Sequence, residues 1–337
     1  MSFRVRPARN DDFDAIYEMA KLTGGGFTNL PPDRKTLKQK LAKSQSAFDK
    51  DIDAPDDDLF LLVLENADTA QVRGTCQIFS RVGSEWPFYS YKLTNLTQSS
   101  KALDRTFRNE MLTLVTDLEG SSEVGGLFLH PNERAGGLGM LLARSRYLFI
   151  RLHRKRFADR IIAELRGVID EAGGSPFWDA LAGKFFDMNF QTADDINAAQ
   201  GNQFIADLMP RTPIYTALLP DTARSVMAIP HPSGRAAMRM LEREGFKYER
   251  HIDIFDGGPT MEAKTDEVRT IRDAKPLKVA EIGPGGKTAL LASGELKEFV
   301  ACYGAVSTGK GGAATLDAKA AGLLNIKVGG CFLRMER

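Results

Sequence analysis

Apolar residues recur along the first 265 residues at the two spacings that distinguish strands from helices. Runs of strand length occur at residues 3–6, 59–64, 74–79, 86–93, 124–129, 160–165, 214–219 and 246–254. Helical spacing occurs over residues 12–22, around Leu37, Leu41 and Phe48, after residue 138, after Ser175-Pro176, and after Ser233. The first hundred residues therefore predict the order strand, helix, helix, strand, strand.

The pattern changes beyond about Met261. Residues 266–337 contain short apolar runs at 277–282, 289–292, 299–303 and 323–328, separated by Gly, Lys and Asp. Evenly spaced short strands are typical of a small barrel or meander. We therefore predict two domains, residues 1–265 and a small β-barrel-like C-terminal domain at residues 266–337, and the length of 337 residues agrees with about two domains.

The stretch from Val124 to Leu142 joins a predicted strand to a predicted helix through glycines. Between the two elements lies Arg134-x-x-Gly137-x-Gly139, with a further glycine at Gly136. The first N–H groups of a helix have no partner inside the helix, and the helix dipole adds positive potential there. Glycines let an anion approach these N–H groups, and Arg134 adds a charge-assisted hydrogen bond. This geometry suits a pyrophosphate, although a tight connection between packed elements has the same pattern.

The spacing of these glycines separates the loop from the common nucleotide-binding motifs. It matches neither G-x-G-x-x-G nor G-x-x-x-x-G-K-[ST]. It resembles the coenzyme A loop of the GCN5-related N-acetyltransferases, whose pattern is Arg/Gln-x-x-Gly-x-Gly/Ala. The strand, helix, strand unit over residues 124–165 also predicts parallel pairing with a right-handed crossover.

Composition restricts the partners and the compartment. The 45 basic and 44 acidic residues give a formal charge of +1, which provides no field to attract nucleic acid or an anionic membrane, so a small ligand is favoured. The sequence shows no signal peptide and no apolar run of membrane-spanning length, so we predict a cytoplasmic protein. The three cysteines, Cys76, Cys302 and Cys331, are widely separated and fit free thiols. No spacing suggests a metal site.

Longer segments resemble arginine N-succinyltransferase, over about residues 1–265. They are Gly24-Gly25-Gly26-Phe27-Thr28, Ser121-Ser122-Glu123, Leu127-Phe128-Leu129, Gly167-Val168-Ile169-Asp170-Glu171, Ser175-Pro176-Phe177-Trp178, Phe204-Ile205-Ala206-Asp207-Leu208-Met209-Pro210, His231-Pro232, Glu244-Gly245-Phe246 and Ile252-Asp253-Ile254-Phe255-Asp256-Gly257-Gly258-Pro259. The resemblance implies an enzyme of arginine catabolism that transfers a succinyl group from succinyl-CoA to the α-amine of L-arginine, which gives N2-succinylarginine and coenzyme A.

The resemblance also implies a fold and several site residues. The fold is the α+β acyltransferase fold, a mixed and partly splayed sheet flanked by helices, with a small C-terminal domain added. The pantetheine arm of succinyl-CoA, a co-substrate and not a permanently bound cofactor, would lie along Gly126 to Leu129, where Leu127, Phe128 and Leu129 are the candidate contacts. His231 matches the proposed proton donor of the family. The family includes enzymes built from paralogous subunits, so we predict a homo-oligomer or an assembly with a paralogous subunit.

The remaining candidates follow from the chemistry of direct transfer. Histidine transfers protons near neutral pH, so His231 suits a general acid, a general base or both, although a lone histidine before a helix can merely cap or pack. The guanidinium of arginine requires a carboxylate, for which Glu123, Asp170 and Glu171 are candidates, unless they form structural salt bridges or caps. Arg166 is a candidate for the succinyl carboxylate. A ping-pong route through Cys76 is disfavoured, because the sequence places no histidine near it.

Two other functions remain open at this level. The same fold could transfer an acyl group to ornithine, to another amine or to a protein lysine. Alternatively, the chain could be a non-catalytic acyl-CoA-binding subunit or sensor.

Overall fold

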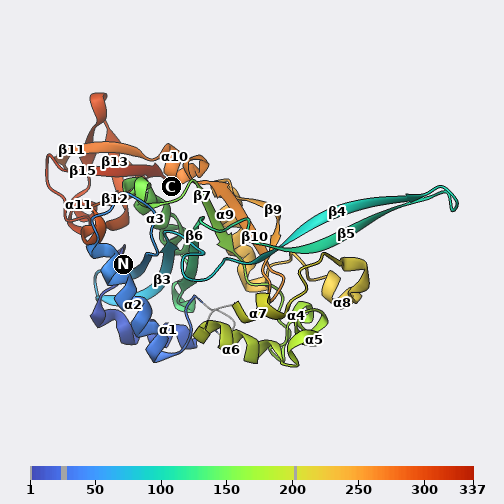
Figure 1. The fold of residues 1–337 in the computed structure, drawn as a ribbon. Helices are drawn as coiled ribbons and strands as arrows, with labels where there is room; N and C mark the ends of the chain where they lie inside the picture. The colour runs from blue at the N-terminus through green and yellow to red at the C-terminus, as the bar shows by residue number, and fades with distance from the viewer. Residues whose placement is uncertain (1, 24–28, 201–202) are drawn as a thin grey trace.

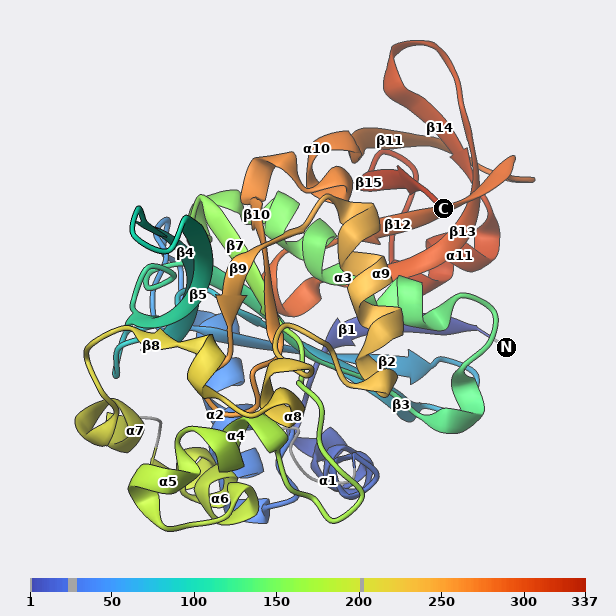
Figure 2. The same ribbon diagram turned by 90° about the vertical axis from the view of Figure 1, so that its right-hand side faces the viewer.

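A single mixed sheet runs through the computed structural model, which describes all residues except 1, 24–28 and 201–202. The hydrogen-bonded strand order is β12-β15-β11-β14-β13-β1-β2-β3-β6-β7-β10-β9-β4-β5-β8. Figures 1 and 2 show the N-terminal helices below this sheet, the C-terminal strands above one end of it, and a long hairpin projecting from the other end. The predicted α+β class is therefore confirmed. The Gly24–Thr28 segment lies outside the described residues.

The first half of the sheet buries both of its faces. Its strands are β1 (Phe3–Pro7), β2 (Leu59–Asn66), β3 (Gln71–Phe79), β6 (Ser122–Leu129), β7 (Arg160–Glu164), β10 (Pro259–Lys264) and β9 (Lys247–Ile252). Along β2, Leu61 and Val63 pack under α1 (Phe13–Lys21), whereas Leu62 and Leu64 pack under α3 (Leu138–Leu152). Helix α2 (Arg34–Asp49) contributes to both clusters.

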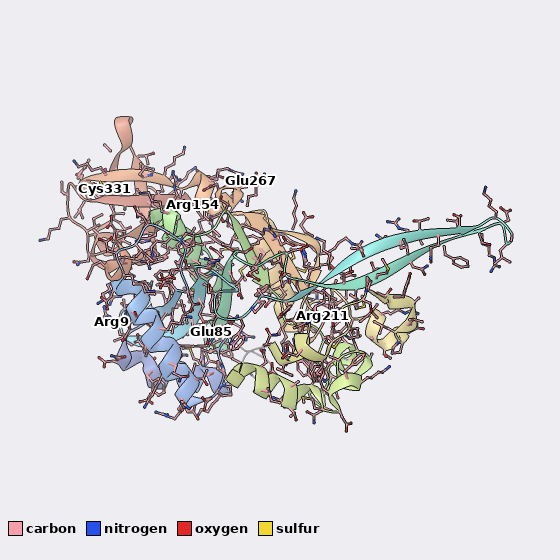
Figure 3. All side chains as sticks on the ribbon, in the orientation of Figure 1. Arg9, Glu85, Arg154, Arg211, Glu267 and Cys331 are labelled. Carbon is pink, nitrogen blue, oxygen red and sulfur yellow. The ribbon has the colours of Figure 1, made fainter. Side chains whose placement is uncertain are left out.

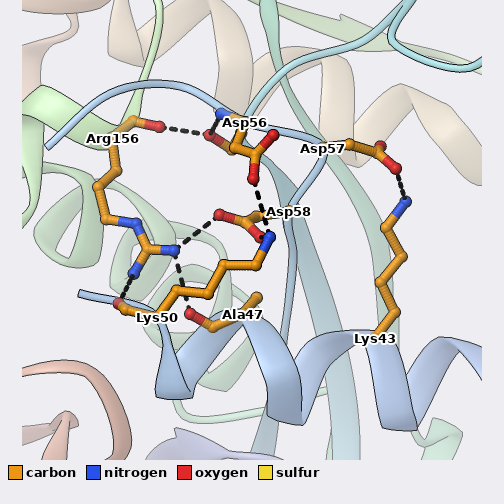
Figure 4. Close-up of polar contacts among 8 residues, drawn as sticks. Lys43, Ala47, Lys50, Asp56, Asp57, Asp58 and Arg156 are labelled. Carbon is orange, nitrogen blue, oxygen red and sulfur yellow. Dashed lines mark hydrogen bonds and ion pairs between the residues drawn. The ribbon is translucent and has the colours of Figure 1, made fainter. Parts of the chain in front are cut away.

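An ionic cluster ties the C-terminal end of α2 to the segment that follows α3 (Figure 4). The Arg156 guanidinium donates to Asp58 at 2.7 Å and to the carbonyl oxygens of Ala47 and Lys50 at 3.0 Å each, and Lys50 Nζ donates to Asp58 at 2.6 Å. Both Arg156 and Asp58 are buried. Removing Asp58 would leave the Arg156 guanidinium as an uncompensated buried charge, which costs about 3–5 kcal/mol in comparable pairs.

The C-terminal strands close into a barrel. They are β11 (Lys275–Ile282), β12 (Lys287–Ser293), β13 (Val300–Thr308), β14 (Ala313–Leu316) and β15 (Cys331–Glu336), and an additional β12–β13 pairing completes the ring. Strand β13 also pairs with β1, so the barrel continues the main sheet. The division at residue 266 stays a prediction.

The predicted strand at residues 86–93 is shifted and much longer in the structure. Strand β4 (Ser90–Ser100) forms a hairpin with β5 (Arg105–Val115), a strand that we did not predict. The outer half of this hairpin extends away from the body in Figure 1. We call residues 93–110 the arm.

Two predicted strands are largely wrong. In the segment 214–219 only β8 (Ile214–Tyr215) pairs, with β5, before a 3-10 turn at Thr216–Leu218. The segment 323–328 is not a strand either. It begins at the last residue of α11 (Ala318–Leu323), a helix whose first turn Asp317 caps by accepting from the Ala320 N–H at 2.9 Å.

The remaining helices are α4 (Pro176–Ala180), α5 (Gly183–Phe186), α6 (Phe190–Gln200), α7 (Gln203–Leu208), α8 (Asp221–Arg224), α9 (Arg235–Glu244) and α10 (Arg269–Asp273). None of the helices within the described residues is long and apolar enough to cross a membrane.

Candidate active site

The parallel strands β6 and β7 separate soon after they begin. Their register contains Ser122 opposite Ile161 and Glu123 opposite Ile162, and the pairing stops there. Beyond Glu123, the edge of β6 that faces β7 is free of strand pairing, as the predicted splayed sheet requires. An extended ligand can pair with such an edge by strand addition.

A bulge follows at Gly126 and Leu127. The register between β3 and β6 shifts between Thr75 and Gln77, and Gly126 has a φ of 56°, a conformation that favours glycine. A Cβ on Gly126 would lie 2.7 Å from the side-chain nitrogen of Gln77. The bulge brings Leu127, Phe128 and Leu129 to the free edge as half-buried residues.

The glycine loop follows β6 and leads into α3. Gly136 and Gly137 have φ values of 64° and 82°, and Gly137 is the N-cap residue of α3. The N–H groups of Ala135 and Leu138 donate to Glu133 and Ala135 within the loop. Within the described part of the chain, no backbone acceptor contacts the N–H groups of Gly136 and Gly137. These two N–H groups, together with the first turn of α3 at Gly139, could donate to an anion, and the assignment of this loop as the coenzyme site stays a prediction.

The Arg134 side chain lies beside this loop and is exposed. Among the described residues, no carboxylate forms an ion pair with it. Its guanidinium is therefore available to a ligand.

The C-terminal barrel supports the loop from behind. Tyr303 Oη donates to the Gly137 carbonyl oxygen at 3.2 Å, and Arg337 Nη2 donates to the Gly136 carbonyl oxygen at 2.7 Å. The Arg337 guanidinium also stacks over the Tyr303 ring, 4.6 Å from its centroid. In a trans peptide the N–H points opposite to the C=O. Because Arg337 holds the Gly136 carbonyl, the Gly137 N–H of the same peptide points away from the barrel.

His231 lies at the end of β7, where β6 has already diverged. Its backbone N–H donates to the Arg166 carbonyl oxygen at 2.7 Å, two residues beyond β7. The side-chain Nδ1 accepts from the Ser233 N–H at 3.3 Å and lies 2.7 Å from Ser233 Oγ. If Nδ1 accepts, the neutral ring carries its proton on Nε2. Partial burial, and then the charge of Arg166, lower the pKa of His231, so the imidazole is neutral near pH 7.

Arg166 itself has an unsatisfied donor. Its Nε is buried, and no acceptor among the described residues bonds to it. Burial lowers the pKa of Arg166 and outweighs the opposing effect of Asp256. A buried guanidinium N–H without an acceptor costs free energy, which a carboxylate ligand would recover.

Glu123 is nearly buried on the face of β6 opposite α3. Burial raises its pKa to about 7, against the effects of a hydrogen bond from Asn29 and the charges of Lys40 and Arg146. Burial also lowers the pKa of Lys40 to about 8. The carboxyl of Glu123 therefore titrates near neutral pH and can exchange a proton there.

Three more carboxyls form a group that reaches Glu123 through Glu164, and sequence reasoning missed them as site residues. Asp256 is buried, and Glu164 and Asp253 are half-buried. Burial raises the pKa of Glu164, and the charges of Asp253, Glu123 and Asp256 raise it further. Asp256 accepts from the N–H groups of Gly167 and Gly258 at 2.7 and 2.8 Å, yet burial and Asp253 still raise its pKa. Burial raises the pKa of all four carboxyls, Glu123, Glu164, Asp253 and Asp256, so they favour their protonated forms unless a cation lies beside them.

The other two predicted carboxylates lie elsewhere in their loop. Asp170 is exposed, and its Oδ1 accepts from the N–H groups of Ala172 and Gly174 at 2.9 and 2.8 Å. Glu171 is the next residue of this turn and is also exposed. The structure therefore places Asp170 in a turn-forming contact and does not bring it together with Glu123.

The cysteines are poor nucleophiles. Cys76 is fully buried, its thiol lies 3.5 Å from the Leu142 carbonyl oxygen, and burial raises its pKa to about 12. Cys302 is equally buried, and only Cys331, labelled in Figure 3, is exposed. Among the described residues, no group of His, Cys, Asp and Glu is arranged to hold a metal ion.

Comparisons with known proteins agree along almost the whole chain. A family model described as the arginine N-succinyltransferase beta subunit matches residues 3–270, and a model of the C-terminal domain of that subunit matches residues 273–331. The arginine N-succinyltransferase of Citrobacter koseri is 41% identical over 293 residues, which cover 86% of this chain and 85% of that protein. The Escherichia coli K12 relative is 41% identical over 280 residues, covering 83% and 81%.

A solved structure agrees equally well. The arginine/ornithine succinyltransferase subunit AI from Pseudomonas aeruginosa superposes with a TM-score of 0.90 at 30% identity, and covers 99% of this chain and 98% of its own.

Proposed function

The chain belongs to the arginine N-succinyltransferase family, as its sequence resemblance predicted, and we infer that it is an acyltransferase that succinylates the α-amine of L-arginine. The structural observation that best supports this substrate pair is the charge distribution at the separated ends of β6 and β7. A substrate with cationic groups would favour the ionised forms of the carboxyls there, and the unsatisfied Nε of Arg166 suits the succinyl carboxylate.

The coenzyme site follows from the glycine loop. The pyrophosphate of succinyl-CoA would accept from the N–H groups of Gly136, Gly137 and Gly139, with Arg134 as an additional donor. The pantetheine arm would pair with the free edge of β6 at Leu127, Phe128 and Leu129. This placement delivers the thioester to the region between Glu123 and His231.

The proposed reaction is direct transfer. The α-amine attacks the thioester carbonyl, a C–N bond forms, and the C–S bond breaks. Glu123, ionised above pH 7, accepts the proton that the amine loses. The Nε2–H of His231 donates a hydrogen bond to the sulfur as it departs as a thiolate, which later takes a proton from water. The buried, protonated thiol of Cys76 does not fit a covalent intermediate.

The activity is tested with the purified chain and a thiol-release assay, comparing succinyl-CoA with acetyl-CoA and L-arginine with L-ornithine. We expect fastest turnover with succinyl-CoA and arginine, with N2-succinylarginine identified by mass spectrometry. Faster turnover of ornithine would favour the second candidate acceptor, which the name of the Pseudomonas relative supports. Tight coenzyme A binding without thiol release on any amine would favour a non-catalytic subunit or sensor instead.

The role of Arg166 is tested by Arg166→Gln. We expect a higher KM for succinyl-CoA and an unchanged KM for acetyl-CoA, since only the succinyl group carries a carboxylate. An equal change for both donors would refute this role.

A further inference from the structure

The arm is a two-stranded ribbon that the body of the molecule supports only at its base. Strand β9 pairs with Tyr91 and Lys92, and β8 pairs with Met111 and Leu112. The β4–β5 register continues from there to Ser100 opposite Arg105 without any further strand beside it. Figure 1 shows this outer part projecting away from the body of the molecule, and Figure 3 shows its side chains there. A ribbon of two strands is marginally stable in water when nothing covers it.

The free edge of β4 lacks the features that normally prevent edge pairing. Residues 93–100 read L-T-N-L-T-Q-S-S, with no charge, proline or glycine. Natural edge strands are usually interrupted by lysine, proline or a bulge, because an uninterrupted edge pairs with other strands. The edge residues Thr94 to Ser100 extend over about 20 Å at about 3.4 Å per residue.

The arm also exposes large apolar side chains. Leu103 at the tip is 68% exposed and Phe107 on β5 is 52% exposed. Further exposed apolar side chains occur near the base of the arm. Leu218, at 80%, lies in the 3-10 turn where Thr216 Oγ1 donates to the Glu110 carbonyl oxygen at 3.1 Å, and Leu208 is 60% exposed at the end of α7. The same chain thus carries an apolar tip and an apolar surface at the base.

We propose that the arm pairs with the arm of a second copy of this chain, β4 edge against β4 edge in antiparallel orientation, about a two-fold axis near Thr97. Thr97 is the midpoint of the free edge, so this symmetry places the tip of each arm at the base of the other. Leu103 and Phe107 of one copy then cover Leu218 and Leu208 of its partner, and the reverse contact follows from the symmetry. An uncharged edge can face itself without like-charge repulsion.

The pairing is tested by Thr97→Glu. Thr97 lies opposite Arg108 within the hairpin, so the new carboxylate has a favourable partner inside its own arm. At the proposed axis, however, the two new carboxylates face each other. We expect wild-type protein to sediment as a dimer or an even-numbered oligomer, and Thr97→Glu to raise the dissociation constant by about tenfold or more. Mixing Thr97→Glu with Thr97→Arg chains should restore the association.

The contact at the base is tested by Leu218→Glu with Val328→Glu as the matched control. Val328 is 61% exposed in the C-terminal barrel, away from the arm. We expect only Leu218→Glu to weaken association, and both variants to keep the circular-dichroism spectrum of the wild type.

A third variant removes the arm while preserving its base. Residues 97–108 are replaced by Asn-Gly, which closes the remaining hairpin at the pair Leu96 and Asn109 with a two-residue turn. We expect this variant to be monomeric. A wild-type protein that stays monomeric through a concentration series, or an armless variant that assembles as well as wild type, would overturn the proposal.

Discussion

Gly137→Val should separate the stability of the glycine loop from its binding of coenzyme A. Gly137 has a φ of 82°, and a residue with a Cβ pays about 1–2 kcal/mol to adopt this conformation. A Cβ there would also lie 2.9 Å from Arg337 Nη2, so the arginine that holds the Gly136 carbonyl must move. Valine further shields the loop N–H groups from a phosphate oxygen. Losing one charge-assisted hydrogen bond costs about 1.5–3 kcal/mol, so coenzyme A affinity should fall about 10- to 100-fold.

The matched control is Gly329→Val, in the C-terminal barrel. Gly329 has a φ of 89°, and a Cβ there would meet nothing within 4 Å. It therefore carries the same backbone strain without any contact to the loop. Urea unfolding should show a similar loss of about 1–2 kcal/mol in both variants, whereas calorimetric titration with coenzyme A should show weaker binding only for Gly137→Val. Unchanged affinity in Gly137→Val, or an equal loss in the control, would refute the loop as the pyrophosphate site.

Four further predictions concern the reacting groups and the support of the loop. His231→Ala should lower kcat by about 10²- to 10³-fold, as removal of a hydrogen-bond donor to a developing charge does, and should leave coenzyme A affinity nearly unchanged; a loss confined to binding would contradict its role in the transfer. Glu123→Gln should remove the acidic limb near pH 7 from the pH profile of kcat/KM, because burial raises the pKa of Glu123 to about 7 and the ionised form accepts the proton; a limb that persists would assign it to another group. The folded protein binds the Glu123 proton more tightly than the unfolded chain does. The stability that this proton contributes is therefore lost as pH rises through about 7. Glu123→Gln should flatten the pH dependence of the melting temperature there. Cys76→Ser should retain most turnover, and inactivity with an unchanged melting temperature would indicate a covalent route. Tyr303→Phe removes the hydrogen bond to the Gly137 carbonyl oxygen and should raise the KM for succinyl-CoA with kcat nearly unchanged; an equal drop in kcat would argue against a role limited to holding the loop.

The local sequence pattern correctly predicted the elements that pack against a core. The apolar spacing of α3 and the continuous apolar run of β2 follow from burial against the same cluster, and both were predicted. The glycines at 136 and 137 were predictable because their left-handed conformation admits few other residues. The parallel pairing of β6 with β7 followed from the strand, helix, strand order.

The sequence pattern failed to predict elements whose side chains do not pack against a core. The arm is exposed on all sides in its outer half, so β5 shows no regular alternation of apolar and polar residues. The run at 323–328 is apolar but follows an alanine-rich segment with an Asp317 cap, and helix propensity prevailed there. At Ile214, pairing with β5 ends after two residues, because the chain turns into a 3-10 conformation.

The acidic part of the site depends on contacts distant in sequence. Glu164 is the last residue of β7, while Asp253 and Asp256 lie in a turn after β9 that sequence alone reads as a glycine-rich connection. Only the β7–β10–β9 pairing brings them close to one another. Conversely, Asp170 and Glu171 follow β7 directly, but the Asp170 turn keeps that carboxylate occupied locally. Position in the sequence alone therefore did not indicate which carboxyls interact with one another.

The closed ring formed by β11 to β15 limits how many molecules can associate by pairing the edges of their sheets. Because β12 pairs on both sides, this end of the sheet offers no open row of peptide groups. Growth by strand addition is then confined to the opposite end. A two-fold contact through β4 leaves the outer part of β5 open at that end, but Arg105, Arg108 and Glu110 place charges along this strand. Association should therefore stop at a finite particle and should not continue into filaments.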